Sequence, residues 1–409
     1  MTFTADREQT IRATIADRRD ELTGLVSALV QQQSTLGHEE GAQRLIADRL
    51  ASAGFTIERI EPDAKAALVD PYAGYPPLSY DGRSSVVGIH RGLGGGQSLQ
   101  LSGHIDVVPI DDADPWVHDP WKGVLSEGKI WGRGAGDMKG GLAAYLIAAE
   151  VVAQSCPDLR GDLVFSSVIE EECTGNGMWS VLHAGHGTDA TLIGEPTNLD
   201  LIHAGTGVVW ARLAARGRSG HSAYTGGDGP FDELARAIAG LRALEAAANR
   251  PPLDAAFAAV SDWPYGMTVG KIGGGVWTSS QPALLEARVR FGFGLDVDPL
   301  DIQTQIIEAV ATAAPAVEVS FEAFRARAYC HDREGALPEL LSEVHASVLH
   351  TEMGTSAFTA TTDARYVDGP CACYGPVASG FHGADEWVDI ESLESVATVV
   401  ALTAARWLA

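Results

Sequence analysis

Apolar residues recur every three to four positions over two segments near the start of the chain, which is the spacing of one buried helix face. The first segment runs from Asp6 to Gln33 without a proline, and the second runs from Glu39 to Ala53 and stops at Gly54. Glycine just after the last helical residue is a common helix C-cap. We therefore expect a helix over each segment.

Short apolar runs follow, with helix-like segments between them. The runs expected to be strands are Val86 to His90, Leu99 to Ser102 and Leu163 to Ile169. A glycine-rich and then alanine-rich segment from Gly140 to Gln154 predicts a helix that packs closely on a sheet. The segment from Pro62 to Ser85, rich in Pro, Gly and Tyr, is expected to be an irregular loop. Strands that alternate with helices indicate an α/β fold with a substantially parallel sheet.

The pattern changes after Glu195-Pro196. Strand-like runs and amphipathic helices then follow in mixed order. The expected strands are Val208 to Ala214 and Ala287 to Phe293, and the expected helices are Phe231 to Ala248 and Pro299 to Thr312. From Ala328 to Ala409 the alternation of strands and helices returns. We therefore predict a discontinuous outer domain, residues 1–204 and 322–409, with a mixed, largely parallel sheet flanked by helices. Residues 205–321 would form an inserted α+β domain.

Charge restricts the partners of this chain. Asp and Glu number 54 against 29 Lys and Arg, which gives a formal net charge of −25 at pH 7. Such a field repels phosphate backbones and anionic bilayers, so we expect neither nucleic acid nor a membrane surface as a partner.

The sequence shows neither a signal-peptide pattern nor an apolar run of about 18 residues. Five irregularly spaced cysteines indicate a reducing compartment, so the expected location is the cytoplasm.

Four clusters of polar residues lie where an apolar run gives way to a glycine-rich loop. They begin at Ser102, Gly132, Ile169 and Gly194. In the first cluster, His104 and Asp106 are two residues apart and would face the same side of a strand. A carboxylate beside an imidazole accepts the Nδ1 proton and leaves Nε2 free to bind a metal. His-x-Asp is common by chance, so a core or surface role stays open for this cluster alone.

The other three clusters contribute carboxylates. Glycines around Asp137 allow close backbone approach and can place its carboxylate in a crowded site, although a tight turn with a solvated Asp has the same pattern. Glu170, Glu171 and Glu172 follow an apolar run, where adjacent carboxylates are costly unless water or cations compensate them. Glu195 precedes a proline, as in an ordinary polar turn.

Two histidine motifs complete the set: Ser219-Gly220-His221-Ser222-Ala223, and Phe381-His382-Gly383-Ala384-Asp385-Glu386. A single histidine in such a loop is usually a polar surface residue. Two histidines and several carboxylates at strand–loop junctions instead match the nitrogen and oxygen ligands of a zinc or cobalt pair. The joint occurrence therefore predicts a metal centre.

Taken in order, these motifs resemble those of the acetylornithine deacetylase, succinyl-diaminopimelate desuccinylase, aminoacylase and carboxypeptidase G family of dinuclear metallohydrolases. The resemblance covers nearly the whole chain and is clearest from Arg83 to Leu393. It implies a catalytic metal-binding domain over 1–204 and 322–409, and an inserted lid or dimerisation domain over 205–321. It also implies a homodimer formed through the insert.

The resemblance implies two divalent ions per chain, zinc in the first place, with cobalt and manganese also able to occupy such sites. Two ligand sets share one bridging carboxylate: His104, Asp137 and Glu195 for one ion, and Asp137, Glu172 and His382 for the other. Asp137 would lie beside a cis peptide bond to Met138.

The remaining implied roles are catalytic. Asp106 would orient His104. Glu171 would be the general base and would take a proton from a metal-activated bridging water. His221 would reach across a dimer interface to the carbonyl oxygen of the substrate.

Substrate recognition is where the sequence departs from the family. Relatives hold the substrate carboxylate with an arginine at the end of the last strand of the insert. Here Gly292 and Leu295 occupy the corresponding places. Arg290 or Arg288 is a candidate replacement for the missing arginine.

A second candidate for carboxylate binding is the run Thr361-Thr362-Asp363-Ala364-Arg365, which precedes the last metal ligand. Thr362 and Arg365 are therefore also taken as substrate candidates. An ion pair of Arg365 with Asp363 or Asp368 is an equally good interpretation of this arginine.

These assignments predict a metal-dependent hydrolase that cleaves the amide bond of a small N-acyl amino acid or a related amide. A dipeptidase or a carboxypeptidase-type exopeptidase is the alternative on the same site. A two-metal phosphoesterase would use similar ligands, but the acidic chain lacks a basic phosphate cradle. A non-catalytic binding protein would have no need for Glu171 beside a full set of ligands.

Overall fold

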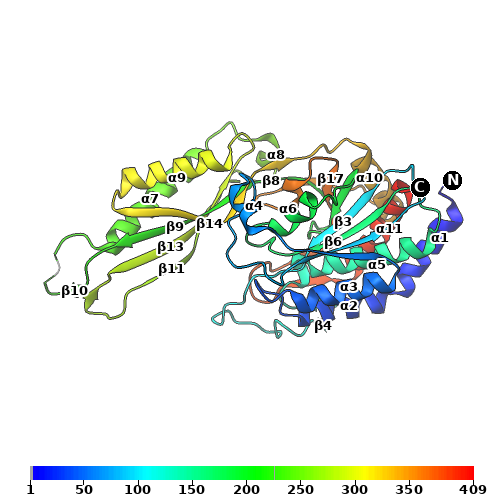
Figure 1. Ribbon diagram of the computed structural model, residues 1–409, viewed down its shortest axis with the longest axis horizontal. Helices are drawn as coiled ribbons and strands as arrows, with labels where there is room; N and C mark the ends of the chain where they lie inside the picture. The colour runs from blue at the N-terminus through cyan, green and yellow to red at the C-terminus, as the bar shows by residue number, and fades with distance from the viewer. Residues whose placement is uncertain (1–2, 225) are drawn as a thin grey trace.

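The computed structural model describes residues 3–224 and 226–409, which form two lobes (Figure 1). The larger lobe holds both ends of the chain and a central mixed sheet with helices on both faces. The smaller lobe holds an antiparallel sheet with helices on one face. The α/β fold class is therefore confirmed. Among the described residues, no helix is long and apolar enough to cross a membrane.

The central sheet of the larger lobe has a parallel centre and antiparallel flanks. Its strands lie in the order β1 (Thr56–Ile60), β2 (Ser85–His90), β6 (Leu163–Val168), β3 (Leu99–His104), β7 (Ala190–Ile193), β17 (Cys371–Cys373), β8 (Leu201–Gly205) and β15 (Tyr329–Cys330), and β16 (Thr355–Phe358) also pairs with β8. The pairs β6–β3, β3–β7 and β7–β17 are parallel. Consequently β3, β6 and β7 end at the same edge of the sheet, where parallel sheets commonly form ligand sites.

Helices cover both faces of this sheet. One face carries α1 (Ala5–Asp17), α2 (Arg19–Gln31), α3 (Glu40–Ser52), α5 (Gly140–Ser155) and α11 (Ile390–Trp407), and α10 (Ala336–Leu349) packs beside α11. The opposite face is covered by α6 (Asn176–His183). Strand β2 shows how the pleat divides the two cores, because Val86 packs with the first set of helices and Val87 packs with Met178 of α6.

A second, smaller sheet brings two distant parts of the chain together. Its strands lie in the order β18 (Ala378–Ser379), β19 (Trp387–Asp389), β5 (Lys129–Trp131) and β4 (Val124–Ser126). The irregular helical turn η1 (Ala135–Lys139) follows β5 and contacts both β18 and β19. The loop that carries Asp137 and the loop that carries His382 therefore lie side by side.

The smaller lobe has its own sheet and its own apolar core. The strands lie in the order β11 (Met267–Gly274), β13 (Leu284–Phe293), β9 (Gly207–Arg216) and β14 (Val317–Ala326), and α7 (Pro230–Ala248) and α9 (Pro299–Ala313) cover one face. The short strands β10 (Gly220–His221) and β12 (Ser280–Gln281) pair at its far end (Figure 1), and α8 (Ala255–Ala258) lies near β8. The insert boundaries at residues 205 and 321 stay a prediction; β14 itself continues to Ala326.

The segment expected to be an irregular loop, Pro62 to Ser85, is partly helical and contacts the smaller lobe. It contains α4 (Ala64–Val69), because Asp63 accepts the backbone N–H groups of Lys65 and Ala66 as an N-cap. Further along, the Tyr75 N–H donates to the Ala323 carbonyl of β14 at 2.7 Å. The prediction of an irregular loop was therefore wrong over α4.

The single helix expected from Asp6 to Gln33 is divided into α1 and α2 at Arg18. This residue leaves helical geometry, with φ −99° and ψ 11°. Its guanidinium donates to Glu21 and to the buried carboxylate of Glu150 on α5. The break between α1 and α2 thus coincides with ion pairs of Arg18 to two glutamates. The periodicity of the sequence alone does not indicate this break.

Glycine is required where α5 crosses the end of β7. A Cβ atom built on Gly141 would lie 1.8 Å from the carbonyl oxygen of Gly194, the residue before Glu195. No real contact is that short, so the first turn of α5 reaches β7 only with glycine at position 141.

We expect Gly141→Ala to lower the free energy of unfolding by about 1–3 kcal/mol, because the new methyl group overpacks against backbone. The matched control is Gly24→Ala in α2, where a Cβ atom has nothing within 4 Å. There alanine should stabilise the helix by about 0.5–1 kcal/mol. Urea unfolding of both variants checks this; equal midpoints for the two would contradict the close approach of α5 to β7.

Candidate metal centre

Three neighbouring strand ends supply candidate ligands. His104 is the last residue of β3, Glu171 and Glu172 follow β6, and Glu195 follows β7. His104, Glu171 and Glu195 are buried, and Glu172 is partly exposed. The parallel register of these strands therefore brings residues that lie far apart in the sequence to one edge of the sheet.

Asp137 and His382 approach this edge on loops. Asp137 lies in η1 with non-helical φ −117° and ψ 96°, and Gly134 before it has a positive φ of 79°. The Asp137–Met138 peptide bond is cis, as the resemblance implied. His382 lies between β18 and β19 with φ 61°, in the left-handed region that few non-glycine residues adopt. Backbone of this kind is characteristic of functional sites.

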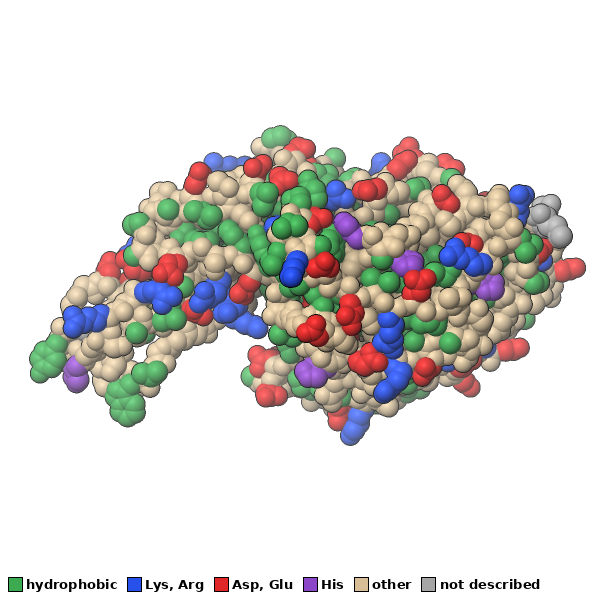
Figure 2. All heavy atoms as spheres, in the orientation of Figure 1, with side chains coloured by type: hydrophobic (Ala, Val, Ile, Leu, Met, Phe, Trp, Pro, Cys, Tyr) green, Lys and Arg blue, Asp and Glu red, His purple; other side chains and the backbone are tan. Residues whose placement is uncertain are grey.

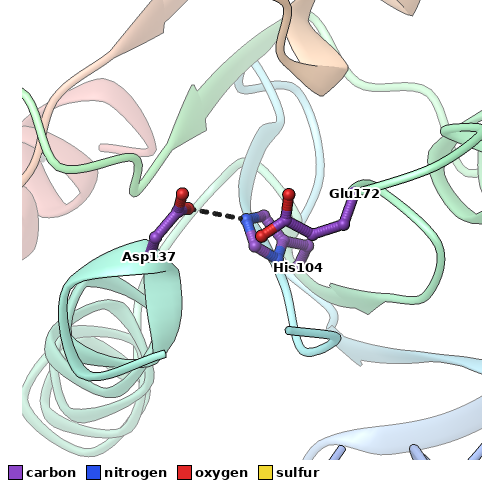
Figure 3. Close-up of side chains that lie close together, drawn as sticks. All are labelled: His104, Asp137 and Glu172. Carbon is purple, nitrogen blue, oxygen red and sulfur yellow. Dashed lines mark hydrogen bonds and ion pairs between the residues drawn. The ribbon is translucent and has the colours of Figure 1, made fainter. Parts of the chain in front are cut away.

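The distances divide these residues into two sets around Asp137. Its Oδ1 lies 3.1 Å from His104 Nε2, and its Oδ2 lies 3.5 Å from His382 Nε2. His104 Nε2 is also 4.0 Å from Glu195 Oε2, and His382 Nε2 is 3.0 Å from Glu172 Oε2. Each oxygen of Asp137 therefore faces a different histidine, and each histidine has a further glutamate beside it. Figure 3 shows Asp137 and Glu172 on either side of His104.

His104 is oriented by the backbone of Asp106. Its Nδ1 lies 2.9 Å from the Asp106 carbonyl oxygen and 3.8 Å from the carboxylate. Because a carbonyl only accepts, Nδ1 donates the proton and Nε2 points to Asp137. The Asp106 carboxylate instead accepts the N–H groups of Glu171 and Glu172, each at 3.1 Å. Asp106 thus connects His104 to the glutamate turn, by contacts that differ from the expected carboxylate–imidazole pair.

Glu171 lies beside the cluster and against a buried arginine. Its Oε1 is 3.4 Å from Arg365 Nη1. Burial raises the pKa of Glu171 well above its usual value, and the charges of Asp363 and Glu195 add to this, whereas His104 and Arg365 oppose it. A carboxylate with a raised pKa that is also close to the candidate metal ligands suits a proton acceptor that later returns the proton.

The other buried carboxylates show how much negative charge meets here. Burial raises the pKa of Asp106 to about 7 and that of Glu195 to about 8. Conversely, hydrogen bonds to Asp137 and Glu172 raise the pKa of His382 to about 11. The site therefore gathers several acidic groups in a buried place, and a bound cation would complement them.

The donor chemistry fits divalent metal ions. Imidazole nitrogen and carboxylate oxygen are the ligands of zinc, cobalt and manganese sites. The ligand atoms of His104, Asp137 and Glu172 lie within 4.8 Å of one another. Small rearrangements of side chains would bring them to the bond lengths of about 2.0–2.2 Å that zinc requires.

Two buried basic side chains near the candidate metal centre, Lys139 and Arg133, were not predicted from the sequence. Lys139 is fully buried, and its Nζ donates to the carbonyl oxygens of Leu29 and Gln32 at the end of α2. Burial lowers its pKa to about 7, with Glu386 and Asp106 opposing that shift. Arg133 pairs with Glu386. The signal was present, because both cations lie in the glycine-rich run around Asp137 and Glu386 follows His382 by four residues.

The proposed substrate residues lie in different surroundings. Arg365 is buried in the turn η2 (Asp363–Tyr366) and donates to Thr362 O at 2.7 Å as well as facing Glu171. Asp363 is 3.8 Å from it, whereas the exposed Asp368 pairs with Arg327 instead. The hydroxyl of Thr362 contacts the Tyr329 hydroxyl at 2.7 Å.

Arg290 and His221 lie on the smaller lobe. Arg290 on β13 donates to the carbonyl oxygens of Gly266 and Thr359, at 2.9 and 3.2 Å. His221 lies on β10 and is exposed, at the far end of the smaller lobe from β3 (Figure 1). Within one chain the structure therefore brings the metal candidates and Glu171 together, and leaves His221 apart from them.

Comparison with known proteins adds a family. A model of the Peptidase family M20/M25/M40 matches residues 100–406, a span that includes every candidate ligand. The chain belongs to this peptidase family. The family predicted from the motifs is thereby confirmed, and the chain is a hydrolase that acts on amide bonds.

Related sequences extend over most of the chain. The succinyl-diaminopimelate desuccinylase of Methylorubrum extorquens (strain PA1) is 29% identical over 396 residues, which cover 92% of this chain and 96% of that protein. The enzyme of the same name from Cereibacter sphaeroides (strain ATCC 17029 / ATH 2.4.9) is 31% identical over 392 residues, with 92% and 96% covered.

Solved structures share the fold at lower identity. Human carnosine dipeptidase 1 superposes with a TM-score of 0.78 at 15% identity and covers 98% of this chain and 99% of its own. An M20 family metallo-carboxypeptidase from Sulfolobus solfataricus gives 0.76 at 14% identity, with 95% and 99% covered. A dinuclear metal-binding peptidase of the family from Bacillus subtilis gives 0.63 at 15% identity, with 96% and 99% covered.

Proposed function

We propose that this chain hydrolyses the amide bond of a small N-acyl amino acid or a related amide, with two divalent metal ions held on either side of Asp137. One observation carries the proposal: the two oxygens of Asp137 face His104 and His382 separately, and each histidine has a glutamate beside it. One ion would be held by His104, Asp137 and Glu195, and the other by Asp137, Glu172 and His382. Zinc is the first choice, with cobalt or manganese as alternatives.

When bound, such ions lower the pKa of water and polarise the scissile carbonyl. Glu171 then accepts the proton of the attacking water and later donates it to the leaving amine. Its position supports this role, because Asp106 fixes its backbone N–H and Arg365 fixes its carboxylate. Burial of Glu171 excludes bulk water from the transfer.

Arg290 is the better of the two arginines for binding a substrate carboxylate. Burial lowers the pKa of its guanidinium, and among residues 3–224 and 226–409 no carboxylate forms an ion pair with it. Arg365, in contrast, already faces Glu171 and Asp363. A guanidinium left without an anion is ready to bind one. The Thr362 hydroxyl is hydrogen-bonded to the Tyr329 hydroxyl, and Thr362 would help to line the substrate site.

Two chains would assemble through the inserted lobe, residues 205–321, with 1–204 and 322–409 as the catalytic domain. Strand β11 is an edge strand and largely exposed, so its backbone is able to pair with a second copy. Exposed hydrophobic side chains gather at the far end of this lobe (Figure 2), and Tyr224, Val276 and Trp277 are exposed. A dimer would let His221 reach the partner's metal centre and bind the substrate carbonyl there.

The second candidate function is exopeptidase activity, either as a dipeptidase or as a carboxypeptidase. It is favoured by the likeness in fold to human carnosine dipeptidase 1 and to the metallo-carboxypeptidase of Sulfolobus solfataricus.

Each of the five cysteines, all within the described part of the chain, is a free thiol, which supports a reducing location such as the cytoplasm.

A substrate panel tests the proposed reaction. N-acetyl, N-formyl, N-succinyl and N-carbamoyl amino acids and dipeptides are offered to the protein with and without a chelator, and release of the free amine is measured. We expect turnover of at least one N-acyl amino acid, loss of that turnover on stringent metal removal, and recovery when zinc, cobalt or manganese is returned. Turnover that survives metal removal would eliminate the metal centre, and turnover of dipeptides alone would favour the exopeptidase.

Glu171→Gln separates proton transfer from metal binding. The amide is nearly the same size but cannot accept the proton, so we expect the variant to keep two ions per chain and to lose at least ~10²-fold in kcat. Metal content and turnover are measured on the same preparation. Near-normal turnover in a metal-replete variant would contradict the role of Glu171.

The two arginines should respond differently to removal. Arg290→Ala should raise KM for an anionic substrate well above its effect on a neutral amide of the same acyl group, because the carboxylate loses its partner. Arg365→Ala should lower kcat for both substrates alike, because it releases Glu171. If Arg365→Ala instead changes KM selectively for the anion, the assignments of the two arginines are exchanged.

A further inference from the structure

Two candidate ligands of the same ion come from loops that are far apart in the sequence. Asp137 lies in η1, and His382 lies in the loop between β18 and β19. The spacing of the two side chains therefore depends on what holds one loop against the other. Asp137 itself has φ −117° and ψ 96°, which is outside helical geometry.

Glu386 provides that connection. Its Oε1 accepts the backbone N–H groups of Gly136 at 3.0 Å and Asp137 at 2.9 Å, and its backbone oxygen accepts the Gly132 N–H at 2.8 Å. Its Oε2 pairs with Arg133 Nη1. Glu386 and Arg133 are each 1% exposed. One buried carboxylate, four residues after His382, thus holds the two consecutive N–H groups of Gly136 and Asp137.

The outer end of the same loop is held by the neighbouring residue. Asp385, with φ 53°, accepts the N–H groups of Val117 and His118 at 3.0 and 2.9 Å. These contacts tie the loop to residues 117–118 and involve no candidate ligand. Of these two acidic neighbours, Glu386 contacts the backbone of the candidate ligand Asp137 and Asp385 does not, so their effects are separable.

We propose that Glu386, supported by Arg133, is a positioning residue that sets the separation of Asp137 and His382 and so determines how tightly the ion between them is held. The inference rests on the proposed metal centre. Hydrogen-bond partners behind metal ligands typically contribute about 10–100-fold to metal affinity, because they fix the ligand before the ion arrives. Here the bond fixes the backbone of the ligand rather than its side chain.

A purely structural role would have a different signature. A buried glutamate that only stabilises the fold should change the unfolding temperature and leave metal affinity alone. Glu150 offers this comparison in the same chain. It is 3% exposed, pairs with Arg18 and Arg49, and lies on α5 away from the ligand loops. Glu150→Gln is therefore the matched control for Glu386→Gln and Glu386→Ala.

The experiment measures zinc binding to the metal-free proteins by competition with a coloured chelator, together with the rise in Tm on adding zinc. We expect Glu386→Ala to bind the ion between Asp137 and His382 about 10–100-fold more weakly. The other ion shares Asp137 but not His382, so its affinity should fall less, and the rise in Tm on adding zinc should be smaller. Glu386→Gln keeps an oxygen for the two N–H groups and should recover part of the affinity. Glu150→Gln should lower Tm without changing either affinity.

Each outcome decides a separate point. Wild-type affinity for both ions in a folded Glu386→Ala variant, with only a lower Tm, would overturn the positioning role. If that variant does not fold, Glu386→Asp carries the test. Its side chain is one methylene shorter and should reach the two N–H groups poorly, which would lower the affinity for the ion between Asp137 and His382. Failure of the unaltered chain to bind two ions would instead overturn the proposed metal centre, and this inference with it.

Discussion

The concentration of carboxylates at one edge of the central sheet is the constraint on which the rest of the structure depends. The carboxylates that act on one another there are Asp106, Asp137, Glu171, Glu172, Glu195 and Asp363. Burial and mutual repulsion both disfavour their charged forms. Arg365 supplies positive charge from within the chain, and bound cations would complement the remainder. The parallel order of β6, β3 and β7 is what brings these groups together, because it ends three strands at one place.

Asp106 and Glu170 hold the turn that bears the proposed general base, by contacts that involve no metal-binding atom. Asp106 holds the N–H groups of Glu171 and Glu172. Glu170, fully buried just before them, accepts the Tyr80 hydroxyl at 2.7 Å and pairs with Arg83 at 2.6 Å. The turn that bears the proposed general base is therefore fixed from both sides. Rigid surroundings of this kind reduce the reorganisation that catalysis would otherwise require.

The sequence predicted the fold class and the ligand candidates because both depend on local signals. Apolar periodicity located β2, β3, β6 and α5, and the polar residues at strand ends indicated where the site lies. The break at Arg18, the cap at Asp63 and the burial of Lys139 depend on partners far along the chain, so periodicity did not reveal them. Distance in the sequence also hid the contact of Arg365 with Glu171, since the two are 194 residues apart.

The close approach of α5 to β7 has an electrostatic consequence. Helix α5 begins at Gly140, directly after Lys139 with helical φ −61° and ψ −29°, and Figure 3 shows Asp137 at this end of the helix. The aligned peptide dipoles of a helix place roughly half a positive charge at its N-terminus. Gly141 lets that end touch the carbonyl of Gly194, next to Glu195. A glycine required by packing thus also allows a whole helix to offset part of the negative charge, without any further basic side chain.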